Sequence, residues 1–287
     1  MIPDYHILTD ILYAFTNAAT FGYRALIPDA MYLMKFFITI EIVILGMHYG
    51  LAGDSNVSVQ AIRKCIFIGF YLWLIPNFHD ISRQVIESFG TAGLKAGGSA
   101  LTKLDLFDPS AIIGYGLDAT EPLFKTGGFC LNPLTLIMMG IGGLLILGAY
   151  FVIAWQLFLT IVEFYIVTVI TVILLPFGLF KPLSFLAERA ISLCFTLGIK
   201  MMIVSFVLAT SYRTLVGLTL PGDATFQQVV TMFLATGSIA LLCWHAPKIC
   251  FSFVGGSPQL SFDDFVRSVS RGGRTGSRIA NTLRPSK

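Results

Sequence analysis

Four ionisable side chains lie inside long apolar runs of this sequence, namely Lys35, Glu41, Glu163 and Lys200. Ionisable residues in membrane-crossing segments usually face protein or water, because an unpaired charge near the bilayer midplane costs at least about 2.5–3.5 kcal/mol on insertion scales. Glu163 therefore suits a polar anchor at a subunit contact or the lining of a pore. The alternative is a hydrated carboxylate close to the outer boundary of the membrane.

Two of these charges have matching predicted depths. Glu41 and Lys200 each lie roughly 15 Å from the predicted cytoplasmic end of their apolar run, at 1.5 Å per residue. We predict an ion pair between Glu41 and Lys200, within one subunit or across a subunit boundary. Two alternatives remain: each charge faces a hydrated axial opening separately, or Glu41 pairs with Lys35.

The other reactive side chains form no catalytic or metal-binding pattern. The four histidines are scattered with no HExxH, the five cysteines include no CxxC pair, and neither a phosphate loop nor a nucleophile elbow is present. We therefore predict no enzymatic activity, no cofactor, no metal and no structural disulfide.

The segment "GIGGLLILG" is a candidate for close helix packing, because small residues let helix backbones approach in lipid. We predict that Gly140, Gly142 and Gly143 lie at an oligomer contact or an axial opening. Packing within one subunit is the alternative.

Composition defines the elements that must position these residues. Of the 287 residues, 55% are apolar and 12% are charged, and the mean hydropathy is +0.79. A soluble domain is about one quarter charged, so this chain has too little polar surface for a water-facing exterior. The sequence predicts an all-α integral membrane protein.

The number of crossings depends on the apolar run 133–180. As one helix it would be roughly 70 Å long, more than twice the hydrocarbon core of a bilayer, yet its middle carries no turn signal. Basic residues near 63–64 and 181–189 and after 254 mark cytoplasmic segments, whereas 79–132 is acidic. These assignments agree only if the run crosses once. We therefore predict about five spans with the N-terminus outside and the C-terminus cytoplasmic; six spans is the alternative.

The same pattern divides the chain into five segments. Residues 1–27 are predicted to form a periplasmic or interfacial helix, 28–78 the first two transmembrane helices, and 79–132 a central periplasmic segment. Residues 133–254 then form a three-span core, and 255–287 a basic cytoplasmic tail. Within the core, Pro176 and Gly178 are expected to break the helix. The tail carries the basic residues Arg267, Arg271, Arg274, Arg278 and Arg284.

One stretch resembles a known family. The residues "EFYIVTVITVILLPFGLFKPLSFLAERAISLCFTLGIKMMIVSFVLA", from Glu163 to Ala209, are similar to the TrbL family of conjugative-transfer proteins. These are VirB-type polytopic inner-membrane subunits of type IV secretion systems. The chain is shorter than we expect of this family and lacks its long low-complexity cytoplasmic extension, which puts contacts made by such a tail in doubt.

The resemblance implies a channel or platform subunit of the bacterial inner membrane that supports translocation of DNA–protein substrate and pilus assembly. It also implies a homo-oligomer surrounded by membrane lipid. The implied partners are an inner-membrane ATPase, periplasmic bridge proteins and pilin, with transient contact to the transferred substrate. A small-solute transporter or ion-channel subunit is the alternative function.

Overall fold

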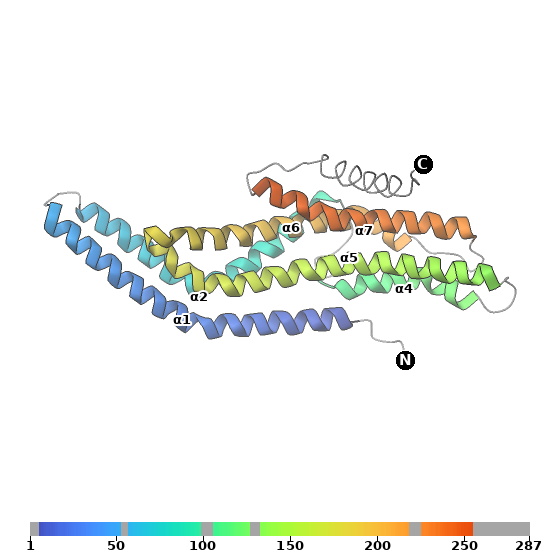
Figure 1. Ribbon diagram of the computed structural model, residues 1–287, viewed down its shortest axis with the longest axis horizontal. Helices are drawn as coiled ribbons and strands as arrows, with labels where there is room; N and C mark the ends of the chain where they lie inside the picture. The colour runs from blue at the N-terminus through green and yellow to red at the C-terminus, as the bar shows by residue number, and fades with distance from the viewer. Residues whose placement is uncertain (1–5, 53–56, 99–105, 127–132, 218–224, 255–287) are drawn as a thin grey trace, which may run out of the picture. The chain divides into compact units, whose positions relative to one another are not determined.

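The computed structural model describes residues 6–52, 57–98, 106–126, 133–217 and 225–254, and every regular element in these ranges is a helix (Figure 1). The chain divides into two compact units, Met1–Pro247 and Lys248–Lys287; the packing described below is that of the first. The helices are α1 (Ile7–Ala52), α2 (Val57–Ala96), α4 (Pro109–Thr126), α5 (Pro133–Leu174), the 3-10 turns η1 (Leu175–Leu179) and η2 (Lys181–Leu183), α6 (Ser184–Gly217) and α7 (Phe226–Val254).

The predicted all-α membrane architecture is confirmed. Five helical segments of the described chain are long and apolar enough to cross a membrane. The long apolar run forms the single uninterrupted helix α5, which ends only at η1, where Pro176 removes a backbone donor. The candidate spans are Ile7–His48, Ala61–Ala96, Ile137–Leu179, Lys181–Gly217 and Phe226–Lys248.

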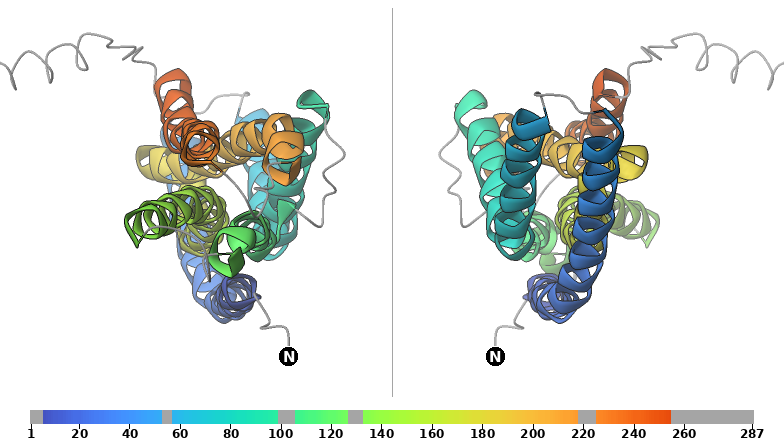
Figure 2. Two further views of the ribbon diagram at one scale, coloured as in Figure 1. Left: turned by 90° about the vertical axis from the view of Figure 1, so that its right-hand side faces the viewer. Right: turned by 90° about the vertical axis from the view of Figure 1, so that its left-hand side faces the viewer.

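The first unit is built from two antiparallel helix pairs. α2 runs back along α1, and η1 with η2 returns α5 into α6. Figures 1 and 2 place α2 beside α6 and α4 beside α5, and α1 also packs along α5. Both helices of each pair therefore contact the other pair.

Small residues permit the close contact between α2 and α6. A Cβ atom added to Gly93 would collide with Ser205 Oγ and the Met202 carbonyl oxygen, and one added to Gly97 would collide with the Ala209 side chain. Without a hydrophobic driving force in lipid, such backbone approach lets van der Waals contacts hold the helices together.

Three prolines lie around one small buried cluster. Pro28 is inside α1, Pro76 is inside α2 and Pro176 begins η1, and Figure 1 shows both long helices bending. The Tyr23 hydroxyl donates a hydrogen bond to the Ile75 carbonyl, next to Pro76. The cluster comprises Tyr23, Ala30, Met34, Tyr71, Leu74, Ile75, Phe78, Val172, Leu175 and Cys194.

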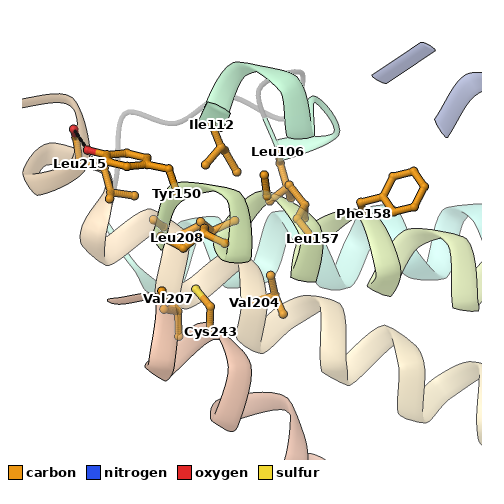
Figure 3. Close-up of a cluster of buried hydrophobic side chains, with 14 of the residues drawn as sticks. Leu106, Ile112, Tyr150, Leu157, Phe158, Val204, Val207, Leu208, Leu215 and Cys243 are labelled. Carbon is orange, nitrogen blue, oxygen red and sulfur yellow. Dashed lines mark hydrogen bonds between the residues drawn. The ribbon is translucent and has the colours of Figure 1, made fainter. Parts of the chain in front are cut away.

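A larger apolar cluster joins α4, α5, α6 and α7 (Figure 3). The fully buried Tyr150 ring packs in it, and its hydroxyl donates to the Leu215 carbonyl at 2.8 Å. This bond satisfies the one polar atom of the ring. Labelled members of the cluster are Leu106, Ile112, Tyr150, Leu157, Phe158, Val204, Val207, Leu208, Leu215 and Cys243.

Two helices are longer than the sequence pattern predicted. The described part of 1–27 is not a separate helix but the first part of α1, because Pro28 bends that helix without ending it. Similarly, α2 continues past Phe78 to Ala96, since its glycine face packs on α6. The predicted basic tail 255–287 lies outside the described residues.

Candidate functional site

A partly buried ion pair joins α5 to α6. Lys200 Nζ lies 2.5 Å from Glu163 Oε2; the lysine side chain is 7% exposed and the glutamate side chain 44% exposed. The lysine is therefore neutralised inside the helix pair, while its partner carboxylate still reaches the surface. Glu163 thus anchors two helices of one chain, while its predicted place at a subunit contact or pore lining stays a prediction.

The second pair joins α1 to α2 and corrects a prediction. Glu41, 7% exposed, binds Lys64. Within the chain, the predicted Glu41–Lys200 pair is therefore wrong, because each residue has a different partner. The alternative partner Lys35 is exposed on α1 and does not pair with Glu41.

Both pairs follow from the antiparallel arrangement. Glu41 and Lys64 are 23 positions apart, and the end of α1 and the start of α2 lie near the middle of that interval. Glu163 and Lys200 are 37 positions apart, with η1 and η2 near the middle. Residues equally far from a turn meet across two antiparallel helices. The predicted depth of Lys200 hid this relation, because it was counted from an assumed cytoplasmic end of the apolar run, whereas α6 begins earlier, at Ser184.

A histidine lies between the two pairs of helices. His79 Nε2 is 3.4 Å from Thr20 Oγ1, and its ring contacts those of Tyr23 and Tyr165, with centroids 5.2 and 6.3 Å away. His79 Nδ1 is buried and has no hydrogen-bond partner within the described chain. We find no sequence signal that would have singled out this residue.

The glycine segment of α5 faces in two directions. A Cβ on Gly142 would collide with Val229 of α7, whereas one on Gly140 would meet nothing within 4 Å; Gly143 is buried. Gly142 also lines an apolar cavity of about 270 Å³ between α5 and α7. Packing within the subunit thus explains Gly142, and of the three glycines predicted at the oligomer contact Gly140 is the one that offers an open face.

The structure has a helix break at the predicted position. Pro176 and Gly178 both lie in η1, and a Cβ on Gly178 would overlap the Tyr71 hydroxyl and ring of α2. The absence of a side chain at Gly178 thus allows α2 to approach the turn between α5 and α6.

A polar face on α2 was not singled out from the sequence. Gln84, Ser88 and Lys95 are exposed along the helix, on the side away from the α6-facing glycines. Glu87 and Thr91 complete the same groove, a hollow of about 420 Å³. The polar residues of this face recur every three to four positions, which the sequence shows. They were missed because the segment 79–132 was predicted to lie outside the membrane.

One cluster of hydroxyl, carboxylate and imidazole groups is a helix cap. Asp108 Oδ1 accepts hydrogen bonds from the Ser110 and Ala111 backbone N–H groups and from the Thr9 hydroxyl, at the start of α4. His6 Nδ1 is 4.0 Å from Asp108 Oδ2. Elsewhere in the described ranges, no three His, Cys, Asp or Glu residues gather in a way that would hold a metal ion.

Five apolar helices, with acid–base pairs buried between them, define a multi-pass α-helical membrane protein. A family model for the TrbL/VirB6 plasmid conjugal transfer protein matches residues 38–246, and the chain belongs to this family. It is also 24% identical over 270 residues to the probable conjugal transfer protein TrbL of Sinorhizobium fredii strain NGR234. That match covers 92% of this chain and 67% of the relative.

Family and fold together identify an inner-membrane, multi-pass component of a conjugal transfer, or type IV secretion, apparatus. The family is a structural component of conjugation and is not a known family of enzymes. Membership also places the chain in a complex with other subunits of that apparatus.

Proposed function

We propose that this protein is a channel subunit of the inner-membrane platform of the conjugation machine. Copies of the chain assemble around an aqueous path, through which the DNA–protein substrate passes. Separate ATPases supply the energy, and periplasmic bridge proteins and pilin dock on the same platform. Family membership supports the place in the machine, and the polar face of α2 supports the channel.

The polar face carries the proposal because it lies on a candidate membrane span. Gln84, Ser88 and Lys95 are exposed within Ala61–Ala96. The candidate span has 36 residues, which is roughly 54 Å of helix and longer than a hydrocarbon core of about 30 Å, so its polar end reaches the water beside the membrane. The opposite face of α2 is occupied by α6, so in an oligomer the polar face suits the wall of a hydrated path. Its hydroxyls and its lysine suit transient contact with a polyanion.

The test removes this polarity and leaves the helix intact. Ser88→Leu with Thr91→Leu should lower the frequency of conjugative transfer at least tenfold, while protein level and oligomer size stay unchanged. The matched control is Thr231→Leu with Ser238→Leu, which replaces two exposed hydroxyls of α7 that are also bonded to their own helix. Transfer as efficient as the control's would instead indicate a scaffold that the substrate does not touch.

A further inference from the structure

A cavity lined by basic side chains lies between α1, α2 and the 3-10 turns η1 and η2. Its volume is about 560 Å³, within the range of small-ligand sites. α1, α2 and both 3-10 turns contribute to its wall, so residues far apart in the sequence converge there. The lining residues are Glu41, Arg63, Lys64, Phe67, Gly178, Leu179 and Lys181.

The cavity has a cation excess. Glu41 is buried and neutralises Lys64, which leaves Arg63 and Lys181. Both of these side chains are exposed, and neither forms an ion pair within the described chain. Three cations against one carboxylate leave two positive charges to bind an anion.

The wall of the cavity is also partly apolar and continues onto exposed apolar surface. Phe67 and Leu179 line the cavity, and Phe67 is 53% exposed. Ile62 and Ile66, which flank the basic residues on α2, are likewise exposed. A free phosphate would use only the basic part of this surface, whereas a phospholipid would use both parts.

We infer that this cavity binds the phosphodiester headgroup of an anionic phospholipid. Arg63 and Lys181 contact the phosphate, while Glu41 holds Lys64 at the wall. The acyl chains lie on the apolar side chains of α2. The basic residues predict that this end of the helices is cytoplasmic, and basic pockets between transmembrane helices on that side bind anionic headgroups. The inference does not depend on the proposed channel.

The experiment uses the full-length purified protein, delipidated in a neutral detergent. Native mass spectrometry measures binding of phosphatidylglycerol, phosphatidylcholine, glycerol 1-phosphate and inorganic phosphate in separate titrations. We expect one site that prefers phosphatidylglycerol to the other three. Arg63→Gln with Lys181→Gln should weaken that binding about 25-fold, at about fivefold per charge removed.

The matched control replaces two exposed cations outside the cavity. Lys35→Gln with Arg189→Gln should leave the affinity unchanged, and Arg63→Lys with Lys181→Arg should retain binding because it retains the charge. Should the glutamine variant fail to fold, binding to the unchanged protein must still weaken as salt rises. Equal binding of phosphatidylcholine, equal binding of free phosphate, or unchanged affinity in the glutamine variant would each overturn the assignment.

Discussion

At the scale of single residues, the buried charges connect helices. Lys200 is almost fully buried against Glu163, and Glu41 is almost fully buried against Lys64. Each pair fixes the relative height of two antiparallel helices, because the pair forms only when both residues are at the same level. Removing one partner leaves the other charge in an apolar environment, which is worse than removing both.

A double-mutant cycle tests the Glu163–Lys200 pair. Lys200→Met should be less harmful together with Glu163→Gln than alone, with a coupling of about 1–3 kcal/mol in unfolding experiments in mixed micelles. Glu163→Gln alone should be the more harmful single change, because the unpaired lysine it leaves is only 7% exposed, whereas Lys200→Met leaves a glutamate that is 44% exposed and can be hydrated. Glu41→Gln combined with Lys200→Met is the control cycle. Its effects should add, and coupling there would contradict the observed pairing.

At the scale of helices, glycine positions decide which faces come together. Gly93 faces α6 so closely that any side chain would collide, whereas Gly69 on the same helix has no neighbour within 4 Å. The two glycines therefore differ in their packing, although both lie in the interior of the same helix. Substitution separates the effect of contact from that of helix propensity.

Gly93→Ala should lower the unfolding free energy by about 1–3 kcal/mol, because the methyl group forces α2 away from α6. Gly69→Ala should leave stability unchanged or raise it by up to about 1 kcal/mol, the helix preference of alanine over glycine. Unfolding in mixed micelles, followed by circular dichroism, compares the two variants. Equal stability of both would show that the α2–α6 contact is looser than described.

The glycines of α5 separate two kinds of contact. Gly142→Leu should destabilise the subunit itself, because Val229 of α7 occupies the space. Gly140→Leu should leave subunit stability unchanged and reduce the oligomer on native gels if its open face is a subunit contact. If Gly140→Leu leaves both the oligomer and transfer unchanged, Gly140 does not lie at the subunit contact.

Much at this scale was predictable from the sequence, and the exceptions have physical reasons. The single helix α5 followed from charge bias and the lack of a turn signal, and the break at Pro176 followed from the missing backbone donor. The Glu41–Lys200 pairing failed because depth was counted from an assumed span boundary instead of from the turn. The length of α2 was missed because the acidic balance of 79–132 placed that segment outside the membrane, although Gly90, Gly93 and Gly97 repeat at helical spacing.

At the scale of the whole molecule, the basic residues of both turns gather. Arg63 and Lys64 lie near the start of α2, Lys181 lies in η2 after α5, and all three line one cavity. Residues that share a cavity lie on one side of a membrane, so the positive-inside bias predicts that both turns are cytoplasmic.

Reporter fusions test this orientation. Fusions at Ser55, Pro182 and Ser277 should report the cytoplasm, and fusions at Ser110 and Gly222 the periplasm. The expectation rests on the basic residues at both turns and on the arginines beyond residue 254. A cytoplasmic signal at Ser110 would overturn the five-span orientation.

The most direct measurement of the central claim is contact between the substrate and the polar face of α2. A photocrosslinking amino acid replaces Ser88 in one strain and Ser238, the exposed control on α7, in another. During transfer, DNA should be recovered with the position 88 protein and not with the position 238 protein, and recovery should cease when the ATPases are inactive. Normal transfer with no DNA crosslinked at position 88 would contradict the proposal that this subunit lines the substrate path.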